Sequence, residues 1–465
     1  MKNIFSLITI VMIAYALSSC KDQLNALPSQ EKVDGNVVVD QKSAEVALNG
    51  VYYQFAEAGT YRSVPSTKTA DGHEVTQAHL AGLVEDPNGN KNYFKNNLIT
   101  PNSFVATSIW APAYNLVNTA NSVITAVTDL PTSKITESRR KSIIAEAKFM
   151  RAYGHARLLW YYAEYKDPDS KYGVFLHTKP INTDNMAGAR GRVKDAYDFI
   201  LADIDEAIQN APTSFANITV TSWTAKALKA RVLINRGAAG DYNNVITLTD
   251  DIIKNSPYTL ETNLKDIFLS KGLSSNEVML GTVPYAGQVN KRDNYLYFGT
   301  PPIVATSTLK TLLENDPRVS WLLKNNQNYI GIAKYLGSQV EVGYMFRLTE
   351  VYLMQAEAIT RNNGNLSTAK TLLKTVMQKA GISDFSIVEN ANTADNLMME
   401  IYKETCKNLL CEDGQEWQAL LRFPLSTIQT LRPSIKSKNQ FILPIPSGEF
   451  LLNPSIGEQN PGYTK

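Results

Sequence analysis

The chain has 465 residues, of which 44% are hydrophobic and 19% are charged, and this composition excludes an intrinsically disordered protein. The formal net charge is only +2, which gives no indication of a nucleic-acid-binding surface. Three cysteines are too few for a disulfide-stabilised scaffold. The 23 tyrosines outnumber the 15 phenylalanines. Because tyrosine joins an apolar ring to a polar hydroxyl, this excess favours a protein with an extensive ligand-contacting surface.

The first 19 residues are predicted to be a secretory signal peptide. One lysine precedes an apolar run over residues 4–17, and two serines precede Cys20. A membrane anchor helix is the alternative, but the run is shorter than the ~20 residues that a bilayer span needs. Residues 17–20, LSSC, resemble a bacterial lipobox, whose cysteine is acylated and becomes the new N-terminus. We therefore expect lipidation of Cys20, followed by a polar tether over residues 20–38.

Apolar residues recur at helical spacing in several segments farther along the chain. Helices are predicted over residues 39–58, 110–130, 143–165, 193–211, 224–236, 241–255, 306–314, 344–360 and 366–380. The segment 143–165 is apolar on several faces, so we expect it to lie at the centre of the molecule, wrapped by other helices. Its Phe149 and Trp160 are predicted core residues.

Several of these helices form pairs joined by short turns, similar to tetratricopeptide units of about 34 residues. Two long segments with many Gly, Asn, Pro and aromatic residues, 59–109 and 256–343, interrupt the pairs. Long inserts in a compact domain are commonly functional. The sequence thus predicts an all-α scaffold of helix pairs with irregular inserts and a few short strands, for example at 277–280.

Three groups of motifs resemble the SusD/RagB family of nutrient-binding lipoproteins on the surface of Bacteroidetes cells. The first is EAKFMRAY at 146–153, and the second is RLTEVYLMQAEA at 347–358. The third is CEDGQEWQALLR at 411–422, followed by FILPIP at 441–446 and QNPGY at 459–463. The chain departs from the family pattern at Glu404, Cys406, Glu416 and Gln418.

The resemblance implies one SusD-like domain over residues 39–465. Its helical scaffold would comprise 39–58, 110–255 and 344–423, its ligand-bearing inserts 59–109 and 256–343, and its irregular C-terminal segment 424–465. The family further implies a lipid-anchored protein exposed on the outer membrane, with a SusC-like TonB-dependent transporter as partner. Its ligands would be oligosaccharides or, in a RagB-like member, peptides.

Sugar rings present C–H faces that stack on aromatic side chains, while Asn, Arg and acidic groups bond the hydroxyls. The candidate ligand-binding residues in or beside the inserts are Tyr61, Arg62, Tyr93, Trp110, Tyr285, Tyr295 and Tyr297. In the competing interpretation Trp110 packs in a helical core and the tyrosines pin the loops. We favour a ligand site for the set as a whole.

The sequence contains no convincing catalytic motif. We therefore expect a binding protein that is not an enzyme and that needs no cofactor and no metal. The segment 73–79 has histidines six positions apart, which is not the zincin spacing. A loop metal site built from Asp71, His73, Glu74 and His79 is an alternative.

The remaining titratable groups also favour binding over catalysis. Asp203 and Asp205 are two positions apart on a predicted helix, so we expect them to point apart and to be solvated. His155 is expected to be a hydrogen-bonded core residue, and Cys406 and Cys411 to be packed thiols in a helical segment. A secreted hydrolase and a pure helical scaffold are the rival classes. The hydrolase would need paired carboxylates or a nucleophile in one pocket, and the scaffold would need no long aromatic inserts.

Overall fold

The computed structural model describes residues 37–56, 58–61, 64–67, 74–95, 97–284, 291, 295, 302–326, 328–339 and 341–465, with only the backbone of 58–61 and 64–67. The predicted signal peptide, Cys20 and nearly all of the tether lie outside these residues. Within them the protein is mainly helical, as predicted. No helix of the described part is both long and apolar enough to cross a membrane.

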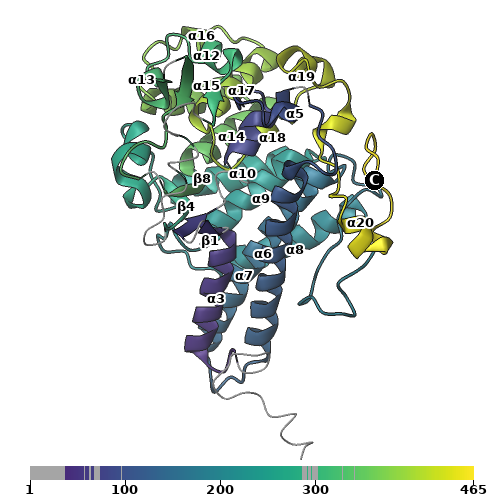
Figure 1. Cartoon of the computed structure of the whole chain (residues 1–465). Helices are drawn as coiled ribbons and strands as arrows, with labels where there is room; N and C mark the ends of the chain where they lie inside the picture. The colour runs from purple at the N-terminus through teal and green to yellow at the C-terminus, as the bar shows by residue number, and fades with distance from the viewer. Residues whose placement is uncertain are drawn as a thin grey trace, which may run out of the picture.

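The longer helices are α3 (Gln41–Phe55), α6 (Phe104–Asp129), α7 (Glu137–Tyr162), α8 (Val193–Asn210), α9 (Ser222–Arg236), α10 (Asp241–Asn255), α14 (Leu348–Arg361), α15 (Leu366–Lys379) and α17 (Ala394–Asn408). The shorter ones are α4 (Thr76–Leu80), α5 (Asn92–Lys95), α12 (Ser307–Leu312), α13 (Val319–Leu322), α16 (Ser386–Glu389), α18 (Gln415–Leu421), α19 (Leu425–Leu431) and α20 (Glu449–Leu452). Single turns of other helix types are η2 (Ile267–Lys271), η3 (Gly272–Ser274), η4 (Lys438–Phe441) and η5 (Pro454–Ile456). In Figure 1, α3, α6 and α7 lie side by side and extend below the rest of the molecule.

The described strands are short, and all of their pairings are antiparallel. β1 (Ala58–Tyr61) and β2 (Val64–Thr67) form a hairpin, and β4 (Val278–Thr282) pairs with β8 (Gly343–Arg347). The third sheet has the order β3-β5-β7-β6, formed by β3 (Val84–Glu85), β5 (Val304–Ala305), β7 (Tyr329–Ile332) and β6 (Leu323–Asn326). The strands of all three sheets lie in the two predicted inserts or at their edges.

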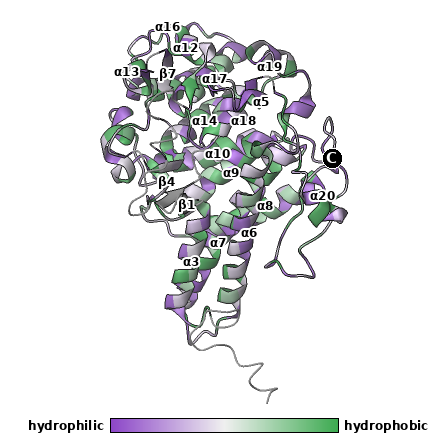
Figure 2. Ribbon diagram, in the orientation of Figure 1, coloured by the Kyte–Doolittle hydropathy of each residue, from purple (hydrophilic) through white to green (hydrophobic). Residues whose placement is uncertain are grey.

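The helix α7 is the centre of the fold, as its pattern predicted. Every residue from 149 to 162 is buried, and α7 packs against α3, α6, α8 and α9. Glycine at position 154 lets α6 approach closely, because a Cβ there would lie 2.8 Å from Cγ2 of Val117 and 3.0 Å from the carbonyl oxygen of Ala113. By contrast, the lower parts of α3, α6 and α7 carry hydrophobic and hydrophilic residues in alternation (Figure 2), as helices with one solvent face do.

Most predicted helices agree with the structure to within a few residues. The helix α9 ends where Gly237 adopts φ 64°, a left-handed conformation that glycine accepts without strain. Two differences are informative. The predicted helix 110–130 begins six residues earlier, at the start of α6, and the first residues of the predicted helix 344–360 belong to β8. The apolar run at 344–346 is buried in a strand, and periodicity alone does not separate a short buried strand from a helix.

Three residue-level expectations need correction. Asp203 is only 4% exposed and not solvated, because its face of α8 packs on α7, where Arg151 donates to both carboxylate oxygens at 2.7 and 2.8 Å. Cys406 and Cys411 are buried free thiols, but Cys411 follows α17 with φ 53° and is not helical. His155 is fully buried as predicted, yet no hydrogen-bond partner among the described residues reaches either ring nitrogen.

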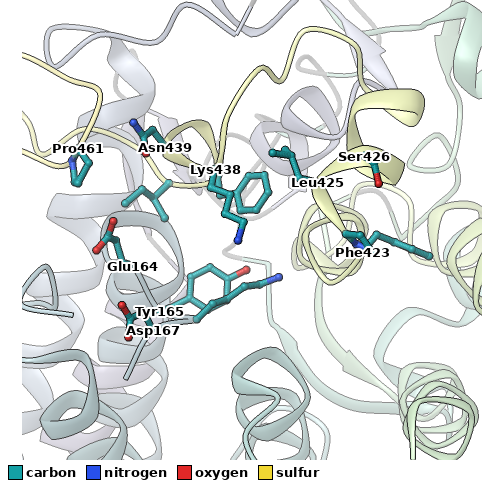
Figure 3. A pocket seen from close by; sticks show the side chains of 13 residues that line it. Glu164, Tyr165, Asp167, Phe423, Leu425, Ser426, Lys438, Asn439 and Pro461 are labelled. Atoms are coloured by element: carbon teal, nitrogen blue, oxygen red, sulfur yellow. The ribbon is translucent and has the colours of Figure 1, made fainter. Parts of the chain in front are cut away.

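The C-terminal segment lies against the end of α7 (Figure 3). Asn460 donates to the carbonyl oxygen of Tyr162 at 2.9 Å and to that of Leu443 at 2.7 Å. The hydroxyl of Tyr463 donates to the carbonyl of Ile442 at 2.8 Å. The NPGY ending therefore closes the fold by satisfying carbonyl groups at the last turn of the central helix and beside it.

Candidate functional site

The two predicted ligand-bearing inserts meet in the structure. β3, from the first insert, pairs with β5, from the second, with Val84 opposite Ala305. Next to this pair, the backbone N–H of Thr306 donates to the carbonyl oxygen of Leu83 at 3.1 Å, and the hydroxyl of Thr306 donates to the same oxygen at 3.0 Å, across 223 positions of the sequence. Segments that are far apart in the chain thus form one surface.

A buried ion pair makes a second contact between the inserts. Nζ of Lys291 donates to Oε1 of Glu74 at 2.7 Å, and the hydroxyl of Tyr295 donates to Oε2 of Glu74 at 2.9 Å. Lys291 also donates to the carbonyl oxygen of Val342 at 2.6 Å, and Nζ lies 3.6 Å from the ring centroid of Tyr335. We call the region held by the β3–β5 pairing and the Glu74–Lys291 pair the insert junction.

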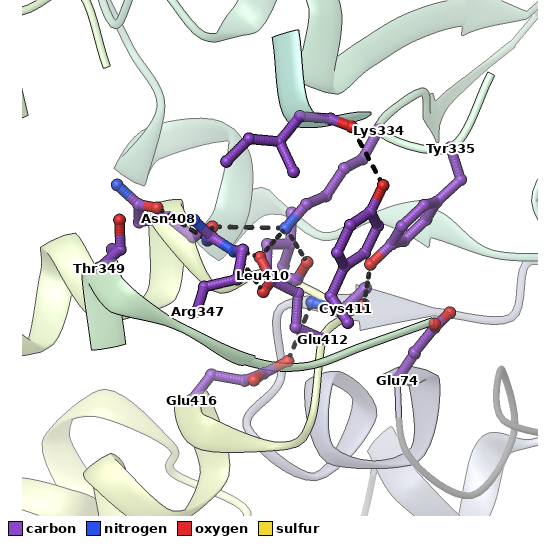
Figure 4. Close-up of polar contacts among 12 residues, drawn as sticks. Glu74, Lys334, Tyr335, Arg347, Thr349, Asn408, Leu410, Cys411, Glu412 and Glu416 are labelled. Atoms are coloured by element: carbon purple, nitrogen blue, oxygen red, sulfur yellow. Dashed lines mark hydrogen bonds and ion pairs between the residues drawn. The ribbon is translucent and has the colours of Figure 1, made fainter. Parts of the chain in front are cut away.

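Buried ion pairs around Glu412 tie the insert junction to the helical scaffold (Figure 4). Arg347, at the end of β8, donates to the two carboxylate oxygens of Glu412 at 2.7 and 2.8 Å. Lys334 donates to the same carboxylate at 2.6 Å, and the hydroxyl of Tyr335 donates to the carbonyl oxygen of Cys411 at 2.7 Å. The second insert is therefore fixed to the connection between α17 and α18.

Burial and neighbouring charge oppose each other in this cluster. Burial alone would raise the pKa of Glu412, but Arg347 and Lys334 hold that pKa below its usual value. Burial lowers the pKa of Lys334, and Glu412 offsets only part of that effect. Arg347 also donates to Glu277 at 2.5 Å. Glu412 first, and then Glu277, hold the pKa of Arg347 above its usual value in spite of burial. Each charge faces an opposite charge, which is the arrangement of a structural support and not of an acid–base pair.

Four of the predicted ligand residues have no described side chain. Arg62, Tyr285 and Tyr297 lie outside the described residues, and of Tyr61, the last residue of β1, only the backbone is described. The backbone of Tyr61 is opposite Val64 in the first insert. The assignment of these four residues to ligand binding stays a prediction.

Tyr93 lies at the insert junction, in the short helix α5. Its ring is half-buried and its centroid is 4.6 Å from that of Phe94. Phe94 in turn stacks on His79 at 4.8 Å, with the ring planes 2° apart. Among the predicted residues with described side chains, Tyr93 is the one whose ring keeps exposed surface.

Trp110 and Tyr295 do not present ligand-stacking faces in this structure. Trp110 is 5% exposed within α6, edge-on to Tyr114 at 5.0 Å and to Tyr162 at 4.9 Å. Tyr295 is fully buried against Tyr335, with the ring centroids 4.9 Å apart, and burial raises its pKa well above the usual value. Because a stacked sugar needs an open ring face, we assign both residues to the core.

The side chains of the alternative loop metal site have other partners where they are described. Both carboxylate oxygens of Glu74 accept hydrogen bonds from the second insert, and Nδ1 of His79 lies 3.0 Å from the carbonyl oxygen of Val84. Burial is the main reason that the pKa of His79 falls to about 3. Asp71 and His73 lie outside the described residues, and the described part of the chain holds no cluster of metal-ligating side chains.

Sequence reasoning named Glu74 only as a ligand of the alternative metal site, and it missed Lys291 and Lys334, which hold the junction together with it. Glu74, Lys291 and Lys334 show no local motif, since their partners are 217 and 78 positions away. A charged residue within an aromatic-rich insert is a weak indication of a buried ion pair, and it does not identify the residue of opposite charge.

Comparison with known families gives two matches. Residues 25–234 match the SusD-like family model described as "Starch-binding associating with outer membrane", and residues 334–437 match the SusD family model. The two matches together cover more than half of the chain and include two of its motif groups and part of the third.

Individual proteins agree with these matches. A SusD-like protein of Bacteroides ovatus is 24% identical over 285 residues, which cover 59% of this chain and 48% of that protein, so the match spans about half of that relative. A SusD superfamily structure from Bacteroides thetaiotaomicron aligns with a TM-score of 0.75 and 21% identity, covering 91% of this chain and 100% of the other. A laminarin-binding SusD-like protein aligns with a TM-score of 0.73 and 20% identity, covering 92% of this chain and 100% of the other.

The helical fold, the motifs and the two family matches define a SusD-type protein. The chain belongs to the SusD/RagB family.

Proposed function

We propose that this protein is a surface-exposed outer-membrane lipoprotein, anchored through Cys20, that binds a nutrient oligosaccharide at the insert junction. It would deliver that ligand to a SusC-like TonB-dependent transporter. The description of the matching family and the laminarin-binding structural neighbour support a saccharide ligand. A peptide ligand, as in a RagB-like protein, is the second candidate.

The observation that carries this proposal is the meeting of the two inserts. The ion pairs around Glu74 and Glu412 fix both inserts to the scaffold, so a ligand spanning them would meet a preorganised surface. Tyr93 lies at this surface, and Tyr61, Arg62, Tyr285 and Tyr297 belong to the same inserts. Binding residues gather on such loops when a rigid scaffold positions them.

We further propose that no bond is broken at this site. The charged groups that hold the junction, which are Glu74, Lys291, Lys334, Arg347 and Glu412, are engaged in ion pairs with one another, and the sequence has no recognised catalytic motif. The rival hydrolase would need an acid, a base or a nucleophile free to act on the ligand.

A screen of the purified whole protein against glycan and peptide libraries tests the proposal. We expect calorimetric binding of an oligosaccharide class, with intact ligand recovered after prolonged incubation. Cleaved product that scales with protein concentration would instead establish the hydrolase. Binding of peptides without any glycan would establish the RagB-like alternative.

A further inference from the structure

A second concave site lies on the side of the molecule where the C-terminal segment meets the end of α7 (Figure 3). Its cavity of about 730 Å³ is lined by residues 164–167, which follow α7, by 423–426, by 438, 439, 441 and 442, and by Pro461. That volume is in the range of small-molecule sites. We call it the C-terminal pocket, and none of its lining residues belongs to the insert junction.

The walls and floor of the C-terminal pocket are largely apolar. They include Phe423, Leu425, Phe441 and Ile442. Tyr165 lies at the floor, 1% exposed, and its hydroxyl has no hydrogen-bond partner among the described residues. A buried hydroxyl without a partner costs free energy that a bound acceptor could recover. Figure 3 shows Lys438 extending into the pocket toward Tyr165.

Two lysine amines reach this apolar pocket without a carboxylate partner. Nζ of Lys166 donates to the carbonyl oxygen of Leu421 and lies 5.8 and 5.9 Å from the ring centroids of Tyr165 and Phe441. This contact uses one of three donor positions of the ammonium group. Lys438 also lines the pocket, and neither lysine forms an ion pair within the described chain.

The charges around Lys166 add to the positive potential of the pocket. Although Lys166 as a whole residue is exposed, its amine end is enclosed by rings. This burial, followed by the nearby Arg422 and Arg361, lowers the pKa of Lys166 to about 7. Glu357, the carboxylate partner of both arginines, offsets part of that effect, and Lys438 lowers the pKa further. An anion bound beside the amine would relieve this unfavourable environment.

The acidic residues of the pocket lie at its edge and already accept hydrogen bonds. Glu164 accepts from the hydroxyl of Ser170 at 2.6 Å, and Asp167 accepts from the backbone N–H of Asp169 at 3.1 Å. In Figure 3 both carboxylates lie at the side of the pocket away from Phe423 and Leu425. They leave the cationic and apolar part free for an anionic ligand.

We propose that the C-terminal pocket is a second binding site, specific for a small carboxylate carried on an apolar body. The carboxylate contacts the amines of Lys166 and Lys438 and accepts from the Tyr165 hydroxyl, while the body packs on Phe423 and Leu425. Two kinds of acid can present this chemistry: a sugar acid offers the C–H face of its ring as the apolar part, and a peptide-type carboxylate offers an apolar side chain. The inference is independent of the function proposed for the insert junction.

Calorimetry on the whole protein with matched probe pairs tests this site. The acids are glucuronate and N-acetyl-leucine, and the neutral controls are glucose and N-acetyl-leucinamide. We expect at least one acid to bind about tenfold or more tightly than its neutral control, and to bind more weakly at high salt because the attraction is ionic. The acid that binds identifies the source as a sugar or a peptide.

Matched lysine variants locate the binding. Lys438→Met removes a side chain without a described hydrogen bond, so the fold should persist, and it should weaken acid binding about tenfold. Lys166→Met should also weaken acid binding about tenfold. Lys436→Met is the control, because its amine bonds the carbonyl of Pro433 outside the pocket. Equal binding of acid and neutral probes, no binding of either acid, or equal losses in all three variants would overturn the proposal.

Discussion

Charged residues of the family motifs pair mainly with other charged residues inside the protein. Arg231 donates to Glu350 at 2.6 and 2.7 Å, and Arg422 donates to Glu357 at 2.6 and 2.7 Å. Glu404, one of the departures from the family pattern, pairs with the fully buried Arg318 at 2.6 Å. These positions specify the packing of the scaffold.

Removing one partner from such a buried cluster should lower the free energy of unfolding. Arg347→Met leaves Glu412 with one cation and deprives Glu277 of its arginine, both in the interior. We expect a loss of about 3–5 kcal/mol in the free energy of unfolding, measured by urea denaturation. Lys171→Met, which breaks the exposed pair with Glu458, is the control and should leave the urea midpoint nearly unchanged, because solvent screens an exposed ion pair. Similar midpoints for the two variants would contradict the structural role of Arg347.

Glu416 gives a pH-dependent prediction. It is fully buried without an ion-pair partner in the described chain, and burial is the main reason that its pKa rises to about 8. Its Oε1 accepts from the backbone N–H of Cys411 at 3.2 Å. An acid with a raised folded-state pKa binds its proton more tightly when folded, so stability falls as pH rises from about 4.5 to about 8.

The substitution Glu416→Gln removes that titration. At pH 5 the variant and the wild type should have similar stabilities, and at pH 8 the variant should be more stable by a few kcal/mol, at about 1.4 kcal/mol per pH unit. Thermal unfolding followed by circular dichroism at both pH values is the measurement. A difference between variant and wild type that is the same at pH 5 and pH 8 would show that Glu416 does not titrate as described.

Individual site residues were harder to predict than helices, for a physical reason. The sequence alone does not distinguish an aromatic residue with a solvent-exposed ring from one with a buried ring. Trp110 and Tyr295 are core residues in the structure. Burial depends on partners such as Tyr162 and Tyr335, which lie 52 and 40 positions away in the chain. Tyr93 keeps partial exposure, and its assignment to ligand binding stays a prediction.

At the scale of elements, helical periodicity was sufficient to predict the helices, because the apolar residues of each helix recur at helical spacing within its own segment. The predicted helix 241–255 coincides with α10, and the predicted centre of the fold is α7. The inserts were not predictable in the same way. The β3–β5 pairing joins residues more than 200 positions apart, and no local pattern specifies such a partner.

The central position of α7 makes its large side chains critical for stability. Phe149 is fully buried and Trp160 is 4% exposed. Replacing either with alanine should lower the free energy of unfolding by about 3–5 kcal/mol, through lost burial and the cavity left behind. The check is the denaturant midpoint, with Phe104→Ala, an exposed position at the start of α6, as the control. A midpoint unchanged by Phe149→Ala would place α7 at the periphery of the stable core.

At the scale of the whole molecule, the described chain begins at residue 37, just before α3, at the lower end of the three helices α3, α6 and α7 (Figure 1). The anchor proposed at Cys20 would therefore place that end of the molecule toward the membrane. Cys20→Ala should abolish acylation, and the protein should shift from the outer-membrane fraction to the soluble fraction or stay unprocessed. Fractionation unchanged from wild type would contradict the lipid anchor.

Ligand binding by the joined inserts is the central claim. It is tested by replacing insert tyrosines that are not placed in the core. Trp110 and Tyr295 are left out because they are buried, so the variant is Tyr93→Ala, Tyr285→Ala and Tyr297→Ala together. Each stacked aromatic should contribute on the order of 1 kcal/mol. Tyr172→Ala, near the C-terminal segment where its hydroxyl bonds Glu458, is the matched control.

The measurement is calorimetric titration of wild type, control and triple variant with the glycan found in the screen. We predict that the triple variant binds at least tenfold more weakly, while the control binds as wild type does and all three keep the same helical circular dichroism. Wild-type affinity in the triple variant would contradict the claim and place the ligand site away from the insert junction.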